Sequence, residues 1–117
     1  MTRRPLIVGN WKLHHDVAAS VALARAVAAG VSAEVPADAN RRPDVVVAPV
    51  FTALDRVHEA LRGSTVGLAG QDLHWEAKGA FTGEVSGPLL TDVGCGYVIV
   101  GHSERRQHFG ATDERVR

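Results

Sequence analysis

The apolar run Tyr97–Val100 constrains the fold most, because it meets Gly101 and then gives way at once to the polar residues His102–Arg106. An apolar run of this length without alternation is typical of a strand that is buried on both faces in a parallel sheet. The polar residues therefore follow the carboxyl end of a strand. In parallel α/β sheets this is the end where ligands bind and catalytic residues gather.

Two interpretations of His102 are open at this position. If Ser103 caps a helix that begins there, His102 faces the positive end of the helix dipole. Such a field favours a neutral imidazole, which donates a hydrogen bond at pH 7. In the second reading His102 only caps a turn, and this stretch alone does not separate the two.

The N-terminus repeats the pattern, because the apolar run Leu6–Gly9 is followed by Asn10 and Lys12. These two residues alternate, so in extended backbone their side chains point the same way. Asp16 then predicts the start of a helix that ends near Gly30. Its apolar residues recur at helical spacing and are Val17, Val21, Ala24, Ala28 and Val31.

A second strand–helix unit is predicted after residues 32–43, which are rich in turn-forming and charged residues and indicate a connection. Val45–Ala48 is the strand, bracketed by prolines. Thr52 and Asp55 resemble a capping box for a helix that ends at Gly63. One face of this helix carries Leu54, Val57 and Leu61.

The third unit contains the strand Val66–Gly70 and the long polar loop Gln71–Glu84. A loop of this length in a compact domain usually has a function. Ser86 and Pro88 predict the start of a short helix that ends at Gly94. We expect its buried residues to be Leu89, Leu90 and Val93.

Strands and helices thus alternate without hairpin signals, which predicts an α/β fold with a parallel sheet and right-handed crossovers. After His102 the chain offers a capping turn and then Thr112 with Asp113 and Glu114, which suit the first turn of a helix. A helix that stops after about one turn lacks the propagation that offsets its nucleation cost. We therefore expect the end at Arg117 to be a cut in a longer domain.

The composition excludes several classes of protein. The 117 residues make room for one domain, and 45% apolar content is ordinary for a globular core. Thirteen basic and thirteen acidic side chains give no net charge, so we expect neither nucleic acid nor a membrane as a partner. One cysteine excludes an internal disulfide, and we recognise no signal or spanning segment. We expect the cytoplasm as the location.

Other chemistries fit the sequence poorly. Six histidines invite a metal site, but they show none of the ligand spacings of known metal motifs, so we predict no metal. Cys95 has no activating histidine in its motif and is more simply a packing residue. Ser103 lies outside a GxSxG motif, and no GxGxxG fingerprint occurs.

Four blocks closely resemble the triosephosphate isomerase family, in the order of that family. They are GNWKLH at 9–14, APVFTALDRV at 48–57, GQDLHWEAKGAFTGEVS at 70–86 and VIVGHSERRQHFG at 98–110. The resemblance implies the first four β/α units of a (β/α)8 TIM barrel, with outer helices around a parallel sheet. Residues 1–117 would then be the N-terminal half of a single domain.

The resemblance also implies an activity and its residues. The reaction is the interconversion of dihydroxyacetone phosphate and glyceraldehyde 3-phosphate in glycolysis and gluconeogenesis, without a cofactor. His102 resembles the catalytic electrophile, Lys12 the catalytic cation, and Lys12 with Asn10 the substrate-binding pair. Glu104 resembles a supporting carboxylate near the lysine, and Ser103 is a second supporting residue.

The family's glutamate base and its later phosphate-binding loops have no counterpart among residues 1–117. We therefore expect the isolated chain to be inactive, since loss of a general base alone costs roughly 10² to 10⁴ in rate. The alternative is a self-associating half-barrel fragment that has no activity.

Family members dimerise by inserting the third loop beside the lysine of the partner. This implies a homodimer in which Thr82, Gly83 and Glu84 form the interface and Asn10 and Lys12 receive it. The unpaired sheet edges of a half-barrel also invite pairing. We expect a chain that is not a monomer, through loop exchange, edge pairing or both.

Overall fold

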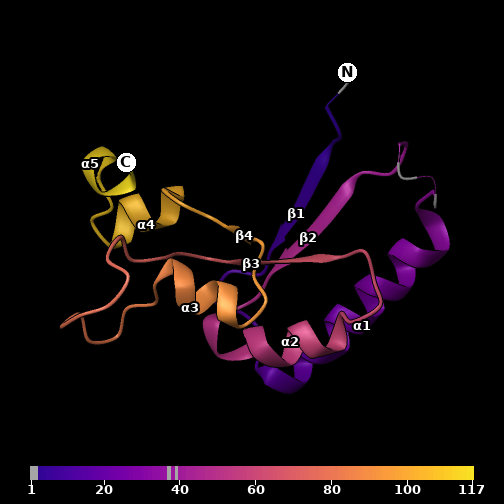
Figure 1. Cartoon of the computed structure of the whole chain (residues 1–117), viewed down its shortest axis with the longest axis horizontal. Helices are drawn as coiled ribbons and strands as arrows, with labels where there is room; N and C mark the ends of the chain where they lie inside the picture. Colours follow the sequence, from indigo (N-terminus) through magenta and orange to yellow (C-terminus); the bar gives the residue numbers. More distant parts are fainter. Residues whose placement is uncertain (1–2, 37, 39) are drawn as a thin grey trace.

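The computed structural model describes residues 3–36, 38 and 40–117, and its centre is a four-stranded parallel sheet (Figure 1). The strands lie in chain order and are β1 (Leu6–Asn10), β2 (Asp44–Ala48), β3 (Gly67–Gly70) and β4 (Tyr97–Val98). The helices between and after them are α1 (Val17–Glu34), α2 (Leu54–Ala60), α3 (Gly87–Asp92), α4 (Ser103–His108) and α5 (Asp113–Val116). The predicted α/β fold with a parallel sheet is confirmed.

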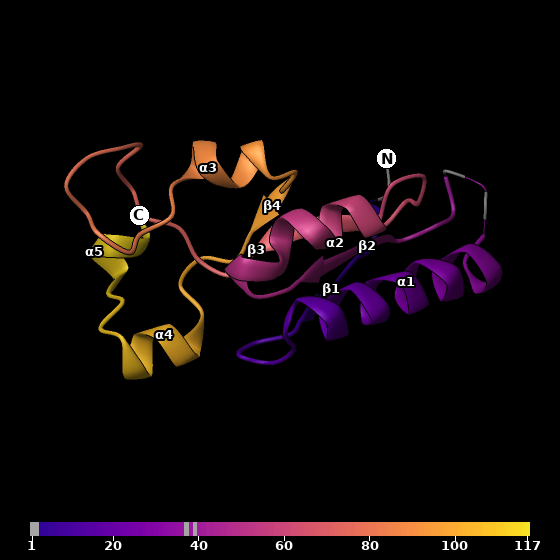
Figure 2. The same ribbon diagram turned by 90° about the horizontal axis from the view of Figure 1, so that it is seen from below.

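The helices α1 and α2 lie side by side along one face of the sheet (Figure 2). Alternate residues of the central strands face them, because successive side chains of a strand point to opposite faces. Val47 and Leu68 pack with the helix residues Ala24 and Val57 in the larger core. The opposite face of the sheet carries a smaller cluster of Val46, Ala48 and Ala69, with Ile99 at its margin.

The outer strands β1 and β4 are exposed, which contradicts the expectation of strands buried on both faces. Leu6 and Ile7 in β1 are 53% and 55% exposed, and Tyr97 in β4 is 43% exposed. Each outer strand has a neighbour on one side only, whereas β2 and β3 are flanked on both. Apolar runs therefore predicted the strands correctly but did not predict which of them this chain buries.

The first helix begins as predicted and ends later. The Asp16 carboxylate accepts a hydrogen bond of 2.9 Å from the Ala19 amide, so the N-cap is confirmed. The helix passes Gly30 and ends at Glu34, because one glycine in a helix interior costs only about 1 kcal/mol. Residues 32–34 thus belong to α1, and the predicted connection is shorter. Residues 37 and 39 of that connection lie outside the described residues.

The second helix does not have the predicted capping box. A short 3₁₀ turn, Phe51–Ala53, leads into α2, and the residue at its N-cap makes no side-chain hydrogen bond. Thr52 lies inside this turn, which leaves no cap position for its hydroxyl. The predicted apolar face is correct, because Leu54, Val57 and Leu61 are all buried.

The third helix is short, and burial differs from the prediction at two of the three residues named. Leu90 is buried, whereas Leu89 is 55% exposed and Val93 is half-buried. Ser86 takes the N-cap position without a side-chain hydrogen bond to the helix. Adjacent leucines on one helical turn face different directions, so α3 buries only one of them.

The helix α1 is also long and apolar enough to cross a membrane by length and composition alone. No such segment was expected from the sequence. Helices that cover sheets in globular proteins meet the same criterion, and α1 packs on α2 with its Ala24 face.

Candidate active site

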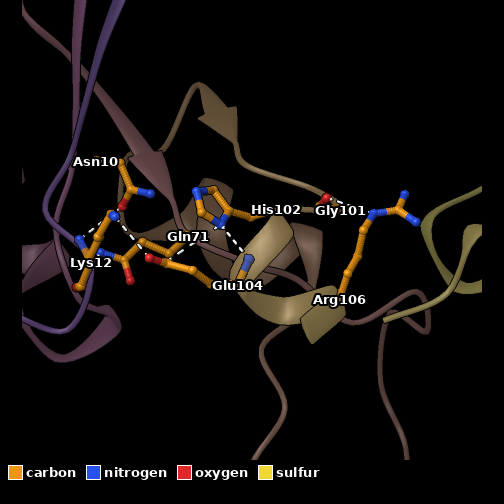
Figure 3. Close-up of polar contacts among 7 residues, drawn as sticks. All are labelled: Asn10, Lys12, Gln71, Gly101, His102, Glu104 and Arg106. Carbon is orange, nitrogen blue, oxygen red and sulfur yellow. Dashed lines mark hydrogen bonds and ion pairs between the residues drawn. The ribbon is translucent and has the colours of Figure 1, made fainter. Parts of the chain in front are cut away.

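The polar side chains that follow three of the four strands converge at the carboxyl edge of the sheet (Figure 3). Asn10 ends β1, and Lys12 follows it in the next turn. Gln71 follows β3, and His102 lies between β4 and α4. Glu104 belongs to the first turn of α4. In α/β proteins with parallel sheets this edge is where ligands bind.

Lys12 lies in a turn with an unusual backbone. Its φ is +54°, in the left-handed region that non-glycine residues rarely adopt. The Lys12 amide donates a hydrogen bond of 2.9 Å to the Asn10 side-chain oxygen. The Asn10 side chain thus contacts the Lys12 backbone within a turn, so the alternation of an extended strand does not describe how these two residues lie.

Gln71 holds the same turn from the other side and was not among the residues predicted for the site. Its side-chain nitrogen donates hydrogen bonds of 2.8 Å to the Lys12 carbonyl and 2.8 Å to the Ala48 carbonyl. It thereby connects the ends of β1, β2 and β3. A signal was present in the sequence, because Gln71 is the first polar residue after an apolar run, as Asn10 and His102 are.

The Lys12 ammonium and the Glu104 carboxylate form an ion pair. Lys12 Nζ lies 2.8 Å from Glu104 Oε1, and both side chains are about half exposed. The hydrogen bond from Lys12 lowers the pKa of Glu104 below its ordinary value, against a smaller opposing effect of desolvation. The carboxylate therefore stays ionised and holds the ammonium at the edge of the site.

His102 is itself the N-cap of α4. Its Nδ1 accepts a hydrogen bond of 3.1 Å from the Glu104 amide, whereas Ser103 is the first helical residue. The predicted cap at Ser103 is wrong, because the imidazole takes that role. The interpretation in which His102 caps a turn is correct in geometry, and no hydrogen bond from the part of the chain that the structure describes occupies the other ring nitrogen.

The cap also decides the tautomer of His102. Glu104 Oε2 lies 3.6 Å from the same Nδ1, which would suit a protonated nitrogen. A backbone amide can only donate, so the shorter amide contact makes Nδ1 the acceptor and places the proton of the neutral ring on Nε2. The ring then offers an N–H donor to a ligand.

The loop between β3 and α3 carries the predicted interface residues Thr82, Gly83 and Glu84, all of them exposed. No hydrogen bond or ion pair among the described residues joins these three to Asn10 or Lys12. Two ring contacts stiffen the loop, because the His74 ring lies 4.2 Å from Trp75 and 4.4 Å from Phe81. Figure 1 shows this loop extending away from β1 and β2.

Two other sequence hypotheses concern metals and the cysteine. The described residues contain no group of three or more histidine, cysteine, aspartate or glutamate side chains that would hold a metal ion. Cys95 is half-buried, and burial raises the pKa of its thiol. A raised pKa lowers the thiolate fraction, as in a packing cysteine.

Comparison with known proteins gives the family. The sequence model of the family described as "Triosephosphate isomerase" matches residues 5–117. The chain belongs to the triosephosphate isomerase family. It is 55% identical over 114 residues to the triosephosphate isomerase of Pelobacter propionicus and 50% identical to that of Moorella thermoacetica.

These relatives are longer than the chain. Both matches cover 97% of this chain and 43% of the relative, so the chain spans less than half of the relatives' length. The structure is also similar to the crystal structure of triosephosphate isomerase from Bartonella henselae, with a TM-score of 0.87 and 36% identity. That match covers 98% of this chain and 45% of the other. The fold thus agrees with the first four β/α units of a TIM barrel.

Proposed function

We propose that residues 1–117 form the N-terminal half of a triosephosphate isomerase barrel, which interconverts dihydroxyacetone phosphate and glyceraldehyde 3-phosphate. The observation that carries this proposal is the convergence of Asn10, Lys12 and His102 at one edge of the sheet. The reaction develops negative charge on a carbonyl oxygen as an enediolate forms. Fixed donors and cations aimed at such an oxygen stabilise it.

Each side chain has a role that its geometry supports. The Nε2–H of His102 donates to the carbonyl oxygen, in the way established for the neutral histidine of triosephosphate isomerases. The half-exposed ammonium of Lys12 binds the phosphorylated substrate and steadies the developing charge, with Asn10 beside it. Glu104 supports Lys12 through their ion pair, and Ser103 supports His102 as the first residue of α4.

The reaction also needs a base that removes a proton from carbon. Glu104 is the carboxylate nearest to His102 and is a poor base, because its pKa is lowered and it is paired with Lys12. We therefore propose that the isolated chain has no measurable isomerase activity. It needs no cofactor when the remaining barrel is supplied.

The test is a completed barrel, in which residues 1–117 are followed by the part of the P. propionicus relative that lies beyond the match. We expect the completed barrel to isomerise the substrate and the chain alone to be inactive. Substantial turnover by the mass-verified chain, or an inactive but folded completed barrel, would overturn the proposal.

Substitutions in the completed barrel test the roles. His102→Gln should lower kcat by about 10² to 10⁴, the usual contribution of a positioned proton-transfer group. Lys12→Ala should raise KM and lower kcat together, because it removes a substrate contact that strengthens in the transition state. His108→Gln, on the exposed part of α4, is the matched control and should change neither constant. Unchanged activity in either site variant would remove that residue from the site.

The proposal includes a homodimer and a cytoplasmic location. Thr82, Gly83 and Glu84 are exposed on an ordered loop, and the turn around Lys12 is open to solvent. Insertion of this loop beside the partner's lysine would bury both surfaces. The proposed substrate is a small phosphorylated triose, whatever the oligomeric state of the barrel.

A second candidate function is a self-associating half-barrel without activity. The exposed apolar residues of β1 and β4 favour it, because the two strands leave unpaired edges at opposite ends of the sheet. Activity of the completed barrel separates this candidate from the first.

A further inference from the structure

The chain bends sharply just before His102. Gly101 has φ +64°, in the left-handed region where glycine is favoured. The bend turns the chain from β4 into α4 and places His102 at the start of that helix. The conformation of Gly101 therefore decides where the imidazole lies.

Arg106 contacts this bend with its side chain (Figure 3). Its Nε donates a hydrogen bond of 3.0 Å to the Gly101 carbonyl, which is the carbonyl of the peptide that joins Gly101 to His102. The same guanidinium reaches α5, because its Nη1 lies 2.6 Å from Asp113 Oδ1. One side chain thus connects the bend, the middle of α4 and the first residue of α5.

The packing around Gly101 is tight as well. A Cβ at this position would lie 2.9 Å from Val116 Cγ1 and 3.2 Å from Arg106 Nη2. Any other residue would therefore be strained in φ and would displace α5 or the guanidinium. The bend, Arg106 and α5 form one packed unit.

His102 is held from both sides by this unit. After it, the Arg105 and Arg106 amides donate to the His102 carbonyl at 3.0 and 3.1 Å, within α4. Before it, the Arg106 guanidinium fixes the Gly101 carbonyl. An arginine fork can make both the carbonyl and the carboxylate contact in one orientation, which a lysine ammonium cannot.

We propose that Arg106 is a positioning residue for His102, which it holds through the Gly101 carbonyl while Asp113 orients the guanidinium. This inference depends on the proposed function only in the measurements of kcat and KM that test it. A displacement of about 1 Å in a reacting group costs up to about 10²-fold in rate. No hydrogen bond or ion pair among the described residues joins Lys12 to Gly101, Arg106 or Asp113.

The experiment compares variants of the completed barrel. Arg106→Ala should lower kcat by about tenfold to a hundredfold and leave KM within about twofold, because only the electrophile moves. Asp113→Asn keeps the guanidinium and should lower kcat by only about threefold, since an exposed ion pair contributes little. Adding Asp113→Asn to Arg106→Ala should cause no further loss, because both act through one contact.

Arg62→Ala is the matched control. It breaks an exposed ion pair of 3.1 Å with Glu59 at the far end of α2 and should leave kcat unchanged. If Arg106→Ala keeps its kcat within about twofold, or if Arg62→Ala loses as much, the proposal is wrong. If Arg106→Ala does not fold, Arg106→Lys replaces it and should show the same loss of kcat at constant KM.

Nitrogen NMR of the His102 ring gives a readout that does not need activity. In the starting barrel Nδ1 should show the shift of an acceptor and Nε2 that of a protonated nitrogen. Arg106→Ala should average the two shifts toward a mixture of tautomers, while Arg62→Ala should not. Unchanged shifts in Arg106→Ala overturn the inference, even if an inactive starting barrel has already overturned the proposed function.

Discussion

The central strands and the outer strands of this sheet differ in burial and in the candidate site residues that follow them. β2 and β3 are flanked on both sides and bury Val47 and Leu68 against the helices. β1 and β4 are exposed, yet Lys12 and His102 follow these two strands. Gln71 follows the central strand β3, and its side chain joins the ends of β1, β2 and β3. The candidate site at the exposed margin is thus joined to the centre of the sheet through Gln71.

The largest expected effect is the difference in the free energy of unfolding that is lost when each of two leucines is replaced by alanine. Leu68→Ala in β3 should lower the free energy of unfolding by about 2 to 5 kcal/mol, because it leaves a cavity in the core. Leu6→Ala in β1 should cost less than about 1 kcal/mol, since that side chain is already 53% exposed. Urea unfolding of the chain, followed by circular dichroism, measures both values.

The completed barrel sharpens this comparison. There the cost of Leu6→Ala should approach that of Leu68→Ala, because the added half would cover the inner face of β1. Equal costs in the isolated chain would show that a second copy or a rearrangement already covers β1.

The next effect concerns association of the isolated chain. Sedimentation at micromolar concentration should show a species larger than the chain mass of 12.4 kDa. Thr82→Arg should weaken loop exchange by adding bulk and charge to the loop, while edge pairing stays intact. Thr52→Arg, in the exposed turn before α2, is the matched control. A single species at the monomer mass would contradict both modes of association.

The smallest effect is the pH dependence of the Lys12–Glu104 pair. Because the folded state lowers the pKa of Glu104 below its ordinary 4.5, the pair stabilises the fold above that value. The stabilisation is lost as the pH falls through the lowered pKa. Glu104→Gln should therefore reduce stability at about pH 7 and make no difference at about pH 2. A difference that persists in acid would assign the effect to packing.

The sequence predicted which helices and strands form better than it predicted the residues at which they begin and end. The N-cap at Asp16 and the buried face of α2 could be predicted, because local hydrogen bonding and hydrophobic periodicity can be recognised in short segments of sequence. The extension of α1 past Gly30 could not be predicted in this way, because packing outweighed a small local cost. The exposure of β1 depends on which strands are neighbours, and a local pattern does not contain that information.

The candidate site was predictable where polar residues follow an apolar run. Asn10, Lys12 and His102 were identified from that pattern, whereas Glu104 and the roles of all four residues came from the family resemblance. Gln71 was missed because its role consists of two hydrogen bonds to carbonyls distant in sequence. The cap at His102 was assigned to Ser103, since serine is the commoner cap and only the geometry shows an imidazole in its place.

Because the backbone of Lys12 is left-handed, selection for stability and selection for the proposed activity would favour different residues at this position. A lysine with positive φ costs of order 1 kcal/mol that glycine would not. Laboratory evolution toward thermal resistance alone would therefore favour replacement of Lys12 by glycine or asparagine. In the completed barrel, selection for the proposed activity would keep the ammonium, and compensating stability would have to come from other positions, such as the cores of β2 and β3.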